Sequence, residues 1–275
     1  MFSITEPDGV PETPLLVEVP HAGLDVPPTL GQCLIAPARS IARDADLYVD
    51  ALYQDAPLDG ATLICARVSR YVVDLNRAEG DIDGESVEGG RGSPKAPRGL
   101  IWRISTDGNP CMLRPLPRHE LEARLAAVYR PYHAAIAQIV ARKRARFGFA
   151  IVLAAHSMPG VGRSINGEPG LVRADVVPGT LGRTSANSRF IDAVDAHARG
   201  AGMTVKHDDP YRGGFTTRHY GRPHDGMHTV QVELARRIYM DEAGLAPRDG
   251  QFAAVRAWCR ELARTLGSER PSFRG

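Results

Sequence analysis

The chain has 275 residues, 43% of them hydrophobic and 24% charged, which is ordinary for a globular protein and enough to bury a sizeable core. The 34 basic and 32 acidic residues give a formal net charge of +2, which argues against a general nucleic-acid binder. No apolar run is long enough to cross a bilayer, and the first residues lack the apolar stretch of a signal peptide. The four cysteines form no CxxC pair, so we expect no cysteine zinc site. Because the chain is too large to need disulfides, we expect free thiols and a cytoplasmic location.

In the first third of the chain, apolar runs predict strands and one helix between loops. LLVEV at 15–19 is apolar and β-prone and ends at a proline, so it indicates a buried strand. We expect a helix over 43–54, and the runs 61–68 and 71–75 predict two strands or one bent ribbon. Residues 79–99 hold Gly, Pro and charge with almost no apolar periodicity, which predicts a long loop that is functional or mobile.

The longest periodic segment, 118–147, predicts a helix because its apolar residues recur at steps of three and four. Pro131 should kink this helix or split it in two. Residues 149–156 are apolar on both faces and predict a buried strand of a parallel sheet. The glycine-rich stretch 160–167 fits no Walker pattern and predicts a mobile loop. The remaining elements are, in order, a helix near 186–199, a strand at 203–207, a strand at 228–234 and a helix at 251–266.

The order of these elements predicts the fold class. Strands and helices alternate, which indicates one α/β domain over residues 1–275 with a mainly parallel sheet. In open sheets of this kind, ligands bind at the carboxyl ends of the strands. Chemistry is therefore expected where the strands end.

Two histidines and a carboxylate lie at predicted strand ends. His21 and His156 each come directly after an apolar strand, and Glu233 lies near the end of the strand TVQVELAR. Side chains of these types, arriving together, indicate a divalent-metal hydrolase site. For each histidine the alternative is an ordinary loop residue, and Glu233 could instead pair with Arg236 or Arg237.

A zinc hydrolase site needs a third protein ligand, and the segment RDADLYVD offers three aspartates. Asp46 and Asp50 would lie one turn apart on one face of the expected helix, whereas Asp44 would point elsewhere. Any of the three could instead be a solvated surface charge. The residues alone leave this ligand open.

Side chains suited to an acidic substrate follow the strand expected at 71–75. Asn76 and Arg77 come directly after it, and the guanidinium fork of arginine fits a carboxylate. Arg103 and Arg218 are further candidates. The alternative for Arg77 is a structural ion pair with Asp74, Asp81 or Asp83.

Taken in order along the chain, these segments resemble the N-formylglutamate amidohydrolase (N-formylglutamate deformylase) family. The resemblance covers most of the chain, and the ordered set is far more specific than any single piece. The pieces are VPHAG at 19–23, DADLYVDALY at 44–53, YVVDLNRAEGDID at 71–83, GLIWR at 99–103, YRPYH at 129–133, AAHSMPG at 154–160, HDDPYRGG at 207–214, and RHYG with HTVQVELARRIYMDE between 218 and 242.

The resemblance implies a three-layer α/β/α fold of the phosphorylase/hydrolase type, similar to that of zinc carboxypeptidases. It also implies that His21 and His156 hold Zn²⁺ or another divalent metal ion. The carboxypeptidase pattern has an acidic ligand three residues after the first histidine, and Leu24 stands there in this chain. Asp46, in the family's own acidic segment, is our choice for the third ligand, with Asp25 and Asp50 left open.

By the same resemblance, the protein hydrolyses a small acidic N-acyl amino acid, most simply N-formyl-L-glutamate to L-glutamate and formate, in histidine degradation. Glu233 would be the general base, and Arg103 would stabilise the oxyanion with the metal. Asn76, Arg77 and Arg218 would bind the substrate carboxylates. The alternatives are a deacylase or carboxypeptidase-like hydrolase acting on another N-acyl amino acid or a short peptide, and a protein that binds metal or ligand without turnover, for which a free carboxylate at Glu233 would have no use.

Overall fold

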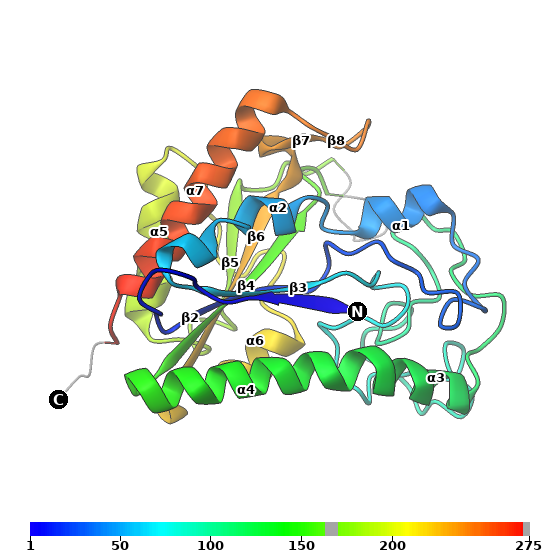
Figure 1. The fold of residues 1–275 in the computed structure, drawn as a ribbon. Coiled ribbons are helices and arrows are strands. Elements are labelled where there is room, and N and C mark those ends of the chain that lie inside the picture. The colour runs from blue at the N-terminus through cyan, green and yellow to red at the C-terminus, as the bar shows by residue number, and fades with distance from the viewer. Residues whose placement is uncertain (163–169, 272–275) are drawn as a thin grey trace.

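The computed structural model of the protein describes residues 1–162 and 170–271 and centres on a six-stranded sheet in the order β1-β3-β2-β4-β6-β5 (Figure 1). The strands are β1 Phe2–Thr5, β2 Leu15–Val19, β3 Thr62–Ala66, β4 Ala150–Met158, β5 Val176–Gly179 and β6 Met227–Ala235. The four inner strands run parallel, and the two edge strands are antiparallel to their neighbours. The predicted α/β class with a mainly parallel mixed sheet is therefore confirmed.

Helices cover both faces of this sheet and make it the middle of three layers. In Figure 1, α4 runs along one face together with α6, while α2, α5 and α7 lie over the other. The helices are α1 Ala38–Asp44, α2 Val49–Tyr53, α3 Arg118–Arg124, α4 Arg130–Phe147, α5 Ser188–Gly200, α6 Phe215–Tyr220 and α7 Asp249–Ser268. Shorter elements are the 3₁₀ turns η1 Ala56–Asp59, η4 Pro223–Asp225 and η5 Arg236–Ile238, the π turn η2 Leu125–Tyr129, and a hairpin of β7 Met240–Asp241 and β8 Ala246–Pro247. Among the described helices, none combines the length and apolar character that crossing a bilayer requires.

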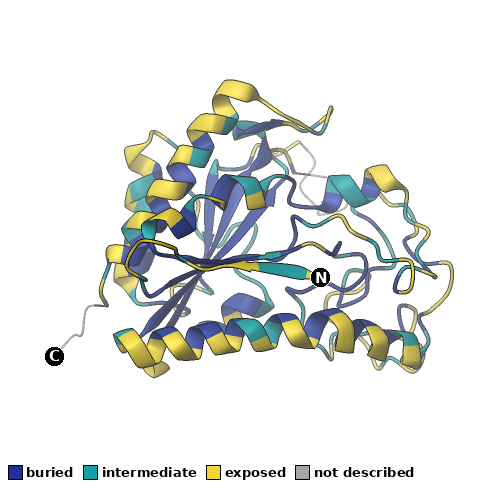
Figure 2. Cartoon of the chain, viewed as in Figure 1, coloured by how far each residue is buried: buried dark blue, intermediate teal, exposed yellow. Residues whose placement is uncertain are grey.

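The two faces of the sheet differ in chemistry because successive side chains of a strand point to opposite sides. On β6, Val230, Val232 and Leu234 pack into the core under α5 and α7. Gln231 and Glu233 alternate with them and face the other side, which carries α4 and α6. Both are nonetheless buried, and Figure 2 shows the central strands of the sheet as buried. Buried polar groups need partners, so these two side chains have to be hydrogen-bonded or bind a ligand.

The long predicted helix forms, and Pro131 does not split it. Between α3 and α4 the chain makes one π turn, Leu125–Tyr129, in which the N–H of Arg130 bonds to the carbonyl of Leu125. The three segments form one continuous rod along the sheet (Figure 1). The wider turn accommodates a residue that has no N–H to donate and whose ring would clash with the preceding turn of a regular α-helix.

The helix expected over 43–54 forms only in part: α2, Val49–Tyr53, lies within this range, but the chain breaks between α1 and α2. Tyr48 adopts a left-handed backbone with φ of 69°. The N–H of Asp46 donates to the carbonyl of His21 at 2.9 Å rather than to a helical carbonyl. Asp46 is thereby fastened to the end of β2, and it shares no helix face with Asp50.

The strand expected at 71–75 is also wrong. The N–H of Val72 bonds to Ser69 and that of Asp74 bonds to Leu100, so the backbone makes turns instead of a sheet ladder. The apolar side chains are buried in the core beneath α4, as their composition predicts. The turns bring Asp74 to the strand ends.

Two further differences concern the sheet edges. Residues 203–207 make a single bridge, from Val205 to Val176, and the edge strand is β5 instead. β5 contains Pro178, which an edge strand tolerates because one side of its ladder is unpaired. The other predicted strands and helices and the long loop at 79–99 are confirmed, and most of the loop expected at 160–167 lies outside the described residues.

Candidate active site

His21, Asp46 and His156 meet in one buried cluster at the carboxyl ends of β2 and β4. Nδ1 of His156 lies 3.0 Å from Oδ2 of Asp46, and Nδ1 of His21 lies 3.6 Å from the same oxygen. All three side chains are 4% exposed or less. The structure thus places together the three residues expected as metal ligands, although they come from three separate parts of the chain.

This cluster fits a metal ion. Two ligands at about 2.0–2.2 Å from a tetrahedral ion lie about 3.3–3.5 Å apart, and the observed spacings of 3.0 and 3.6 Å bracket that range. Nδ1 of His21 is buried and has no hydrogen-bond partner in the described part of the chain. A buried polar atom without a partner is costly, and coordination of a cation would satisfy it.

The buried carboxylate of Asp74 orients His21 through the ring nitrogen that points away from the cluster. Nε2–H of His21 donates to Oδ1 of Asp74 at 2.8 Å, so the other ring nitrogen, Nδ1, is the one that faces the cluster. The other oxygen of Asp74 accepts from Arg70, at 2.8 and 3.2 Å, and from the indole N–H of Trp102 at 3.0 Å. Burial by itself raises the pKa of Asp74, but the neighbouring Arg70 and His21 outweigh it and hold the pKa well below its usual value.

Asp46 is likewise oriented through the carboxylate oxygen that points away from the two histidines. Oδ1 accepts from Nη2 of Arg236 at 3.1 Å, so only Oδ2 faces the imidazoles. Arg236 is itself fixed by Ser157 and by the carbonyl of Arg43. Burial alone raises the pKa of Asp46, but its contacts with His156 and His21 outweigh it, and the pKa lies well below the usual value. Asp46 is thus an oriented carboxylate suited to bind a cation through one oxygen.

Glu233 lies beside the cluster, on the strand next to His156. The two residues are directly paired in the ladder between β4 and β6. Glu233 is 6% exposed, and burial raises its pKa, against the opposing influence of His156. It does not pair with Arg236 or Arg237, whose partners are Asp46 and Asp175. A carboxylate placed here can take up and return a proton.

The cluster opens into a cavity of about 1320 Å³ that is rich in arginine. Asn76 is 4% exposed, and its Nδ2 lies 3.3 Å from Nε2 of His156. Arg77 makes no ion pair with the expected aspartates; its guanidinium donates to the carbonyls of Arg98 and of Asn76. Arg218 lines the cavity, and its guanidinium makes no hydrogen bond or ion pair with any described residue. The arginines that line the cavity are Arg43, Arg70, Arg77, Arg98, Arg173, Arg212, Arg218 and Arg236.

Arg103 is not among the residues that line this cavity, so the oxyanion role expected for it finds no support in the geometry and stays a prediction. Nη1 of Arg103 pairs with Glu85 at 2.6 Å, and Nε lies 3.5 Å from Asp83. The preceding residue, Trp102, lines the cavity instead. Of the other aspartates considered as ligands, Asp44 accepts from Tyr71 and from Thr106, whereas Asp25 and Asp50 are exposed and lie outside the cluster.

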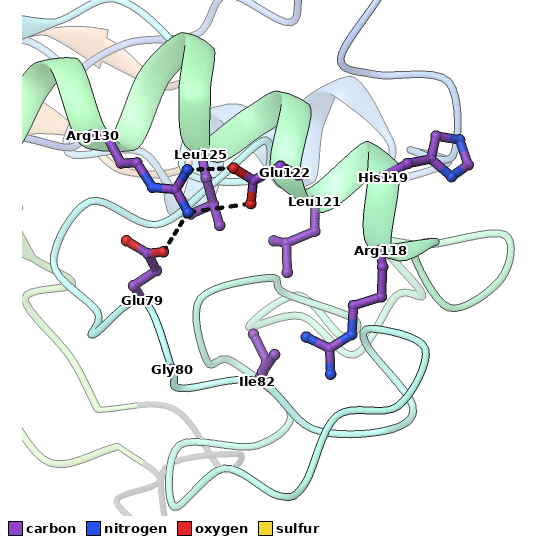
Figure 3. A pocket seen from close by; sticks show the side chains of 9 residues that line it. All are labelled: Glu79, Gly80, Ile82, Arg118, His119, Leu121, Glu122, Leu125 and Arg130. Carbon is purple, nitrogen blue, oxygen red and sulfur yellow. Dashed lines mark hydrogen bonds and ion pairs between the residues drawn. The ribbon is translucent and has the colours of Figure 1, made fainter.

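A second, shallower hollow lies between the 79–82 segment and the helix rod (Figure 3). Its charges neutralise one another: Arg130 pairs with Glu79 at 2.8 Å and also with Glu122. In Figure 3 these three side chains meet at one end, while His119 points outward. Among the described residues, the lining of this hollow includes no cluster of groups that could bind a metal ion.

Comparison with known proteins agrees with this site. The model of the family described as N-formylglutamate amidohydrolase matches residues 13–240. The chain belongs to this family. An N-formylglutamate deformylase of Pseudomonas aeruginosa is 36% identical over 260 residues, 92% of each chain, and one of Pseudomonas putida is 33% identical over 235 residues, 83% of this chain and 82% of the relative. The predicted family and the predicted class of activity, amide hydrolysis of the N-formylglutamate deformylase type, are thus confirmed.

Solved structures also resemble this member of the N-formylglutamate amidohydrolase family. The crystal structure of N-formylglutamate amidohydrolase from Ralstonia eutropha superposes with a TM-score of 0.88 at 30% identity and covers 97% of this chain and 96% of that one. A gene product from Agrobacterium tumefaciens superposes with a TM-score of 0.65 at 22% identity, covers 96% of this chain and 94% of that one, and shares the fold.

Three residues of the site were missed by the sequence analysis as functional residues. Asp74 was considered only as a partner of Arg77, and Arg236 only as a partner of Glu233. Gln231 donates to Glu233 at 2.9 Å and was not considered. The sequence could have indicated Gln231, because a residue two positions before Glu233 on the same strand lies on the same face. For Asp74 and Arg236 the sequence carries no comparable signal, because their partners lie far away in the chain.

Proposed function

We propose that this protein is a metal-dependent N-formylglutamate deformylase that converts N-formyl-L-glutamate into L-glutamate and formate. The observation that carries the proposal is the buried cluster of His21, Asp46 and His156, with an unpartnered nitrogen, at the floor of an arginine-lined cavity. Zn²⁺ is the metal that we propose, because two imidazoles and one carboxylate are a common zinc ligand set that leaves a position open. The four cysteines are free thiols, which supports the cytoplasmic location that we propose along with it.

A bound divalent ion supplies Lewis-acid polarisation and lowers the pKa of a water molecule from 15.7 to about 7. Glu233 takes the proton from the attacking water and returns it to the leaving amine. Its burial favours this exchange, because a raised pKa brings the carboxyl closer to the working pH. Asp74 and Arg236 keep His21 and Asp46 in place throughout.

The two carboxylates of N-formylglutamate call for at least two cationic groups. Asn76 and Arg77 lie at one side of the cluster, and Arg218 adds a guanidinium that has no partner among the described residues and could bind an anion. A formyl group needs little space, so we assign substrate selection to these carboxylate contacts. The whole chain works as one domain in this proposal, because the ligands come from residues 21 to 156 and the base from residue 233.

The test combines metal analysis with a substrate panel. Protein purified without added metal should carry near-stoichiometric divalent metal, and a chelator should remove both metal and activity. Formate or acetate release is then measured with N-formyl-L-glutamate, N-formyl-L-leucine and N-acetyl-L-glutamate. We expect the highest kcat/KM with N-formyl-L-glutamate. A preference for N-formyl-L-leucine would refute the acidic substrate, a preference for N-acetyl-L-glutamate would make the protein another deacylase, and metal binding without turnover of any substrate would refute the enzymatic role.

A further inference from the structure

Gln231 links the proposed base to the part of the chain that surrounds the substrate. Its side chain lies on β6, on the same face as Glu233, and it is 3% exposed. Nε2–H donates to Oε1 of Glu233 at 2.9 Å. Within the described residues this is the only hydrogen bond that the carboxylate of Glu233 receives. The orientation of Glu233 therefore depends on one neighbour.

The other end of the Gln231 amide is fixed just as firmly. Its Oε1 accepts from the backbone N–H of Gly214 at 2.9 Å, and from Asn76 and Thr217 at 3.4 Å each. Gly214 directly precedes α6, which carries Arg218. A Cβ at Gly214 would lie 2.3 Å from the amide of Asn76, so only glycine allows this approach. The assignment of N and O in Gln231 follows from this pattern, because a backbone N–H can only donate.

We propose that Gln231 is a positioning residue, which holds the carboxylate of Glu233 toward the metal cluster and ties its place to the segment that contacts the substrate. This inference rests on the proposed function, in which Glu233 is the base. One oxygen of Glu233 is held by the amide, and the other is left for the reacting water. Gln231 itself touches no reacting atom, so its effect on catalysis passes entirely through Glu233.

The test is a double-mutant cycle with Gln231→Met and Glu233→Gln. Methionine keeps the length and unbranched shape of glutamine but cannot donate to the carboxylate. If Gln231 acts by positioning the base, Gln231→Met should lower kcat by about 10- to 100-fold in the wild-type background, the range expected for a misplaced catalytic group. In the Glu233→Gln background the same change should alter the residual kcat by less than about twofold, because the group it positions is already gone. Metal content should stay near the wild-type level in all variants.

Thr229→Val is the matched control. Thr229 lies on the same strand and face, two residues before Gln231, and its hydroxyl has no hydrogen-bond partner among the described residues. Valine has the same shape, so kcat should remain within about twofold of wild type. This control shows whether a change in the buried face of β6 is enough to disturb the site without touching Glu233.

Crystal structures of the wild type and of Gln231→Met give a readout that does not depend on activity. We expect the Glu233 carboxylate to change rotamer or lose order in Gln231→Met. An unchanged Glu233 rotamer, or an equal fall of kcat in both backgrounds, would overturn the positioning role. If the wild-type protein releases no formate from N-formyl-L-glutamate, the proposed substrate fails, whereas the crystal structures still decide whether Gln231 holds Glu233.

Discussion

Replacing Glu18 with glutamine should remove a pH-dependent loss of stability that the burial of this carboxyl imposes. Glu18 lies on β2, three residues before His21, and is fully buried. One of its oxygens accepts from Tyr132 at 3.2 Å and from Thr216 at 3.1 Å, and the other has no hydrogen-bond partner in the described residues. Burial raises the pKa of Glu18 from 4.5 to about 7, and the charge of His156 and these two hydrogen bonds oppose the shift only in part.

The sign and size of the effect follow from this shift. The folded protein holds the proton of Glu18 more tightly than the unfolded chain does, so the contribution of Glu18 to stability is fully present below pH 4.5 and is lost as the pH rises through 7. A shift from 4.5 to about 7 corresponds to a loss of about 3 kcal/mol in full, of which about 2.5 kcal/mol falls between pH 5 and pH 8. Glutamine keeps the oxygen that accepts from Tyr132 and Thr216 and does not ionise.

Urea unfolding of wild type and Glu18→Gln at pH 5, 6, 7 and 8, at one ionic strength and with matched metal content, measures the difference. We expect the free energy of unfolding of Glu18→Gln minus that of wild type to increase by about 2.5 kcal/mol from pH 5 to pH 8. Glu88→Gln removes the same charge from an exposed side chain and should show no such divergence. A difference between Glu18→Gln and wild type that stays constant from pH 5 to pH 8 would refute the reasoning.

Four further predictions concern the site itself. His21→Ala should lose most bound metal and activity while Asp50→Ala keeps both, as measured by metal analysis and formate release; near-stoichiometric metal in His21→Ala would remove it from the ligand set. Glu233→Gln should keep its metal and lower kcat by about 10²-fold or more, whereas lost metal would make Glu233 a ligand instead. Arg77→Lys keeps the charge but loses the fork, so kcat/KM for N-formyl-L-glutamate should fall by about tenfold or more, and an unchanged value would make Arg77 structural. Asp74→Asn should weaken metal affinity by about 10- to 100-fold in a chelator competition, and an unchanged affinity would show that Asp74 does not support His21.

The sequence by itself determined the elements whose side chains repeat with a regular period. The apolar run at 150–155 and the three-four spacing of 118–147 were sufficient for β4 and for the helix rod, because burial on one or both faces leaves a periodic pattern in the chain. The rule that ligands gather at the carboxyl ends of parallel strands then placed His21 and His156 at one edge. These inferences depend only on the chain direction and on the side chains that follow each strand.

Only the tertiary structure decided how the site is held together. The segments at 45–48 and 71–75 looked like a helix and a strand, but their backbones turn so that Asp46 bonds to His21 and Asp74 reaches the same histidine from the other side. Such contacts join residues far apart in sequence, so they leave no local period to detect. The ion pairs of Arg103 escaped the sequence for the same reason: its acidic partners, Glu85 and Asp83, come from a long irregular loop whose path no local pattern specifies.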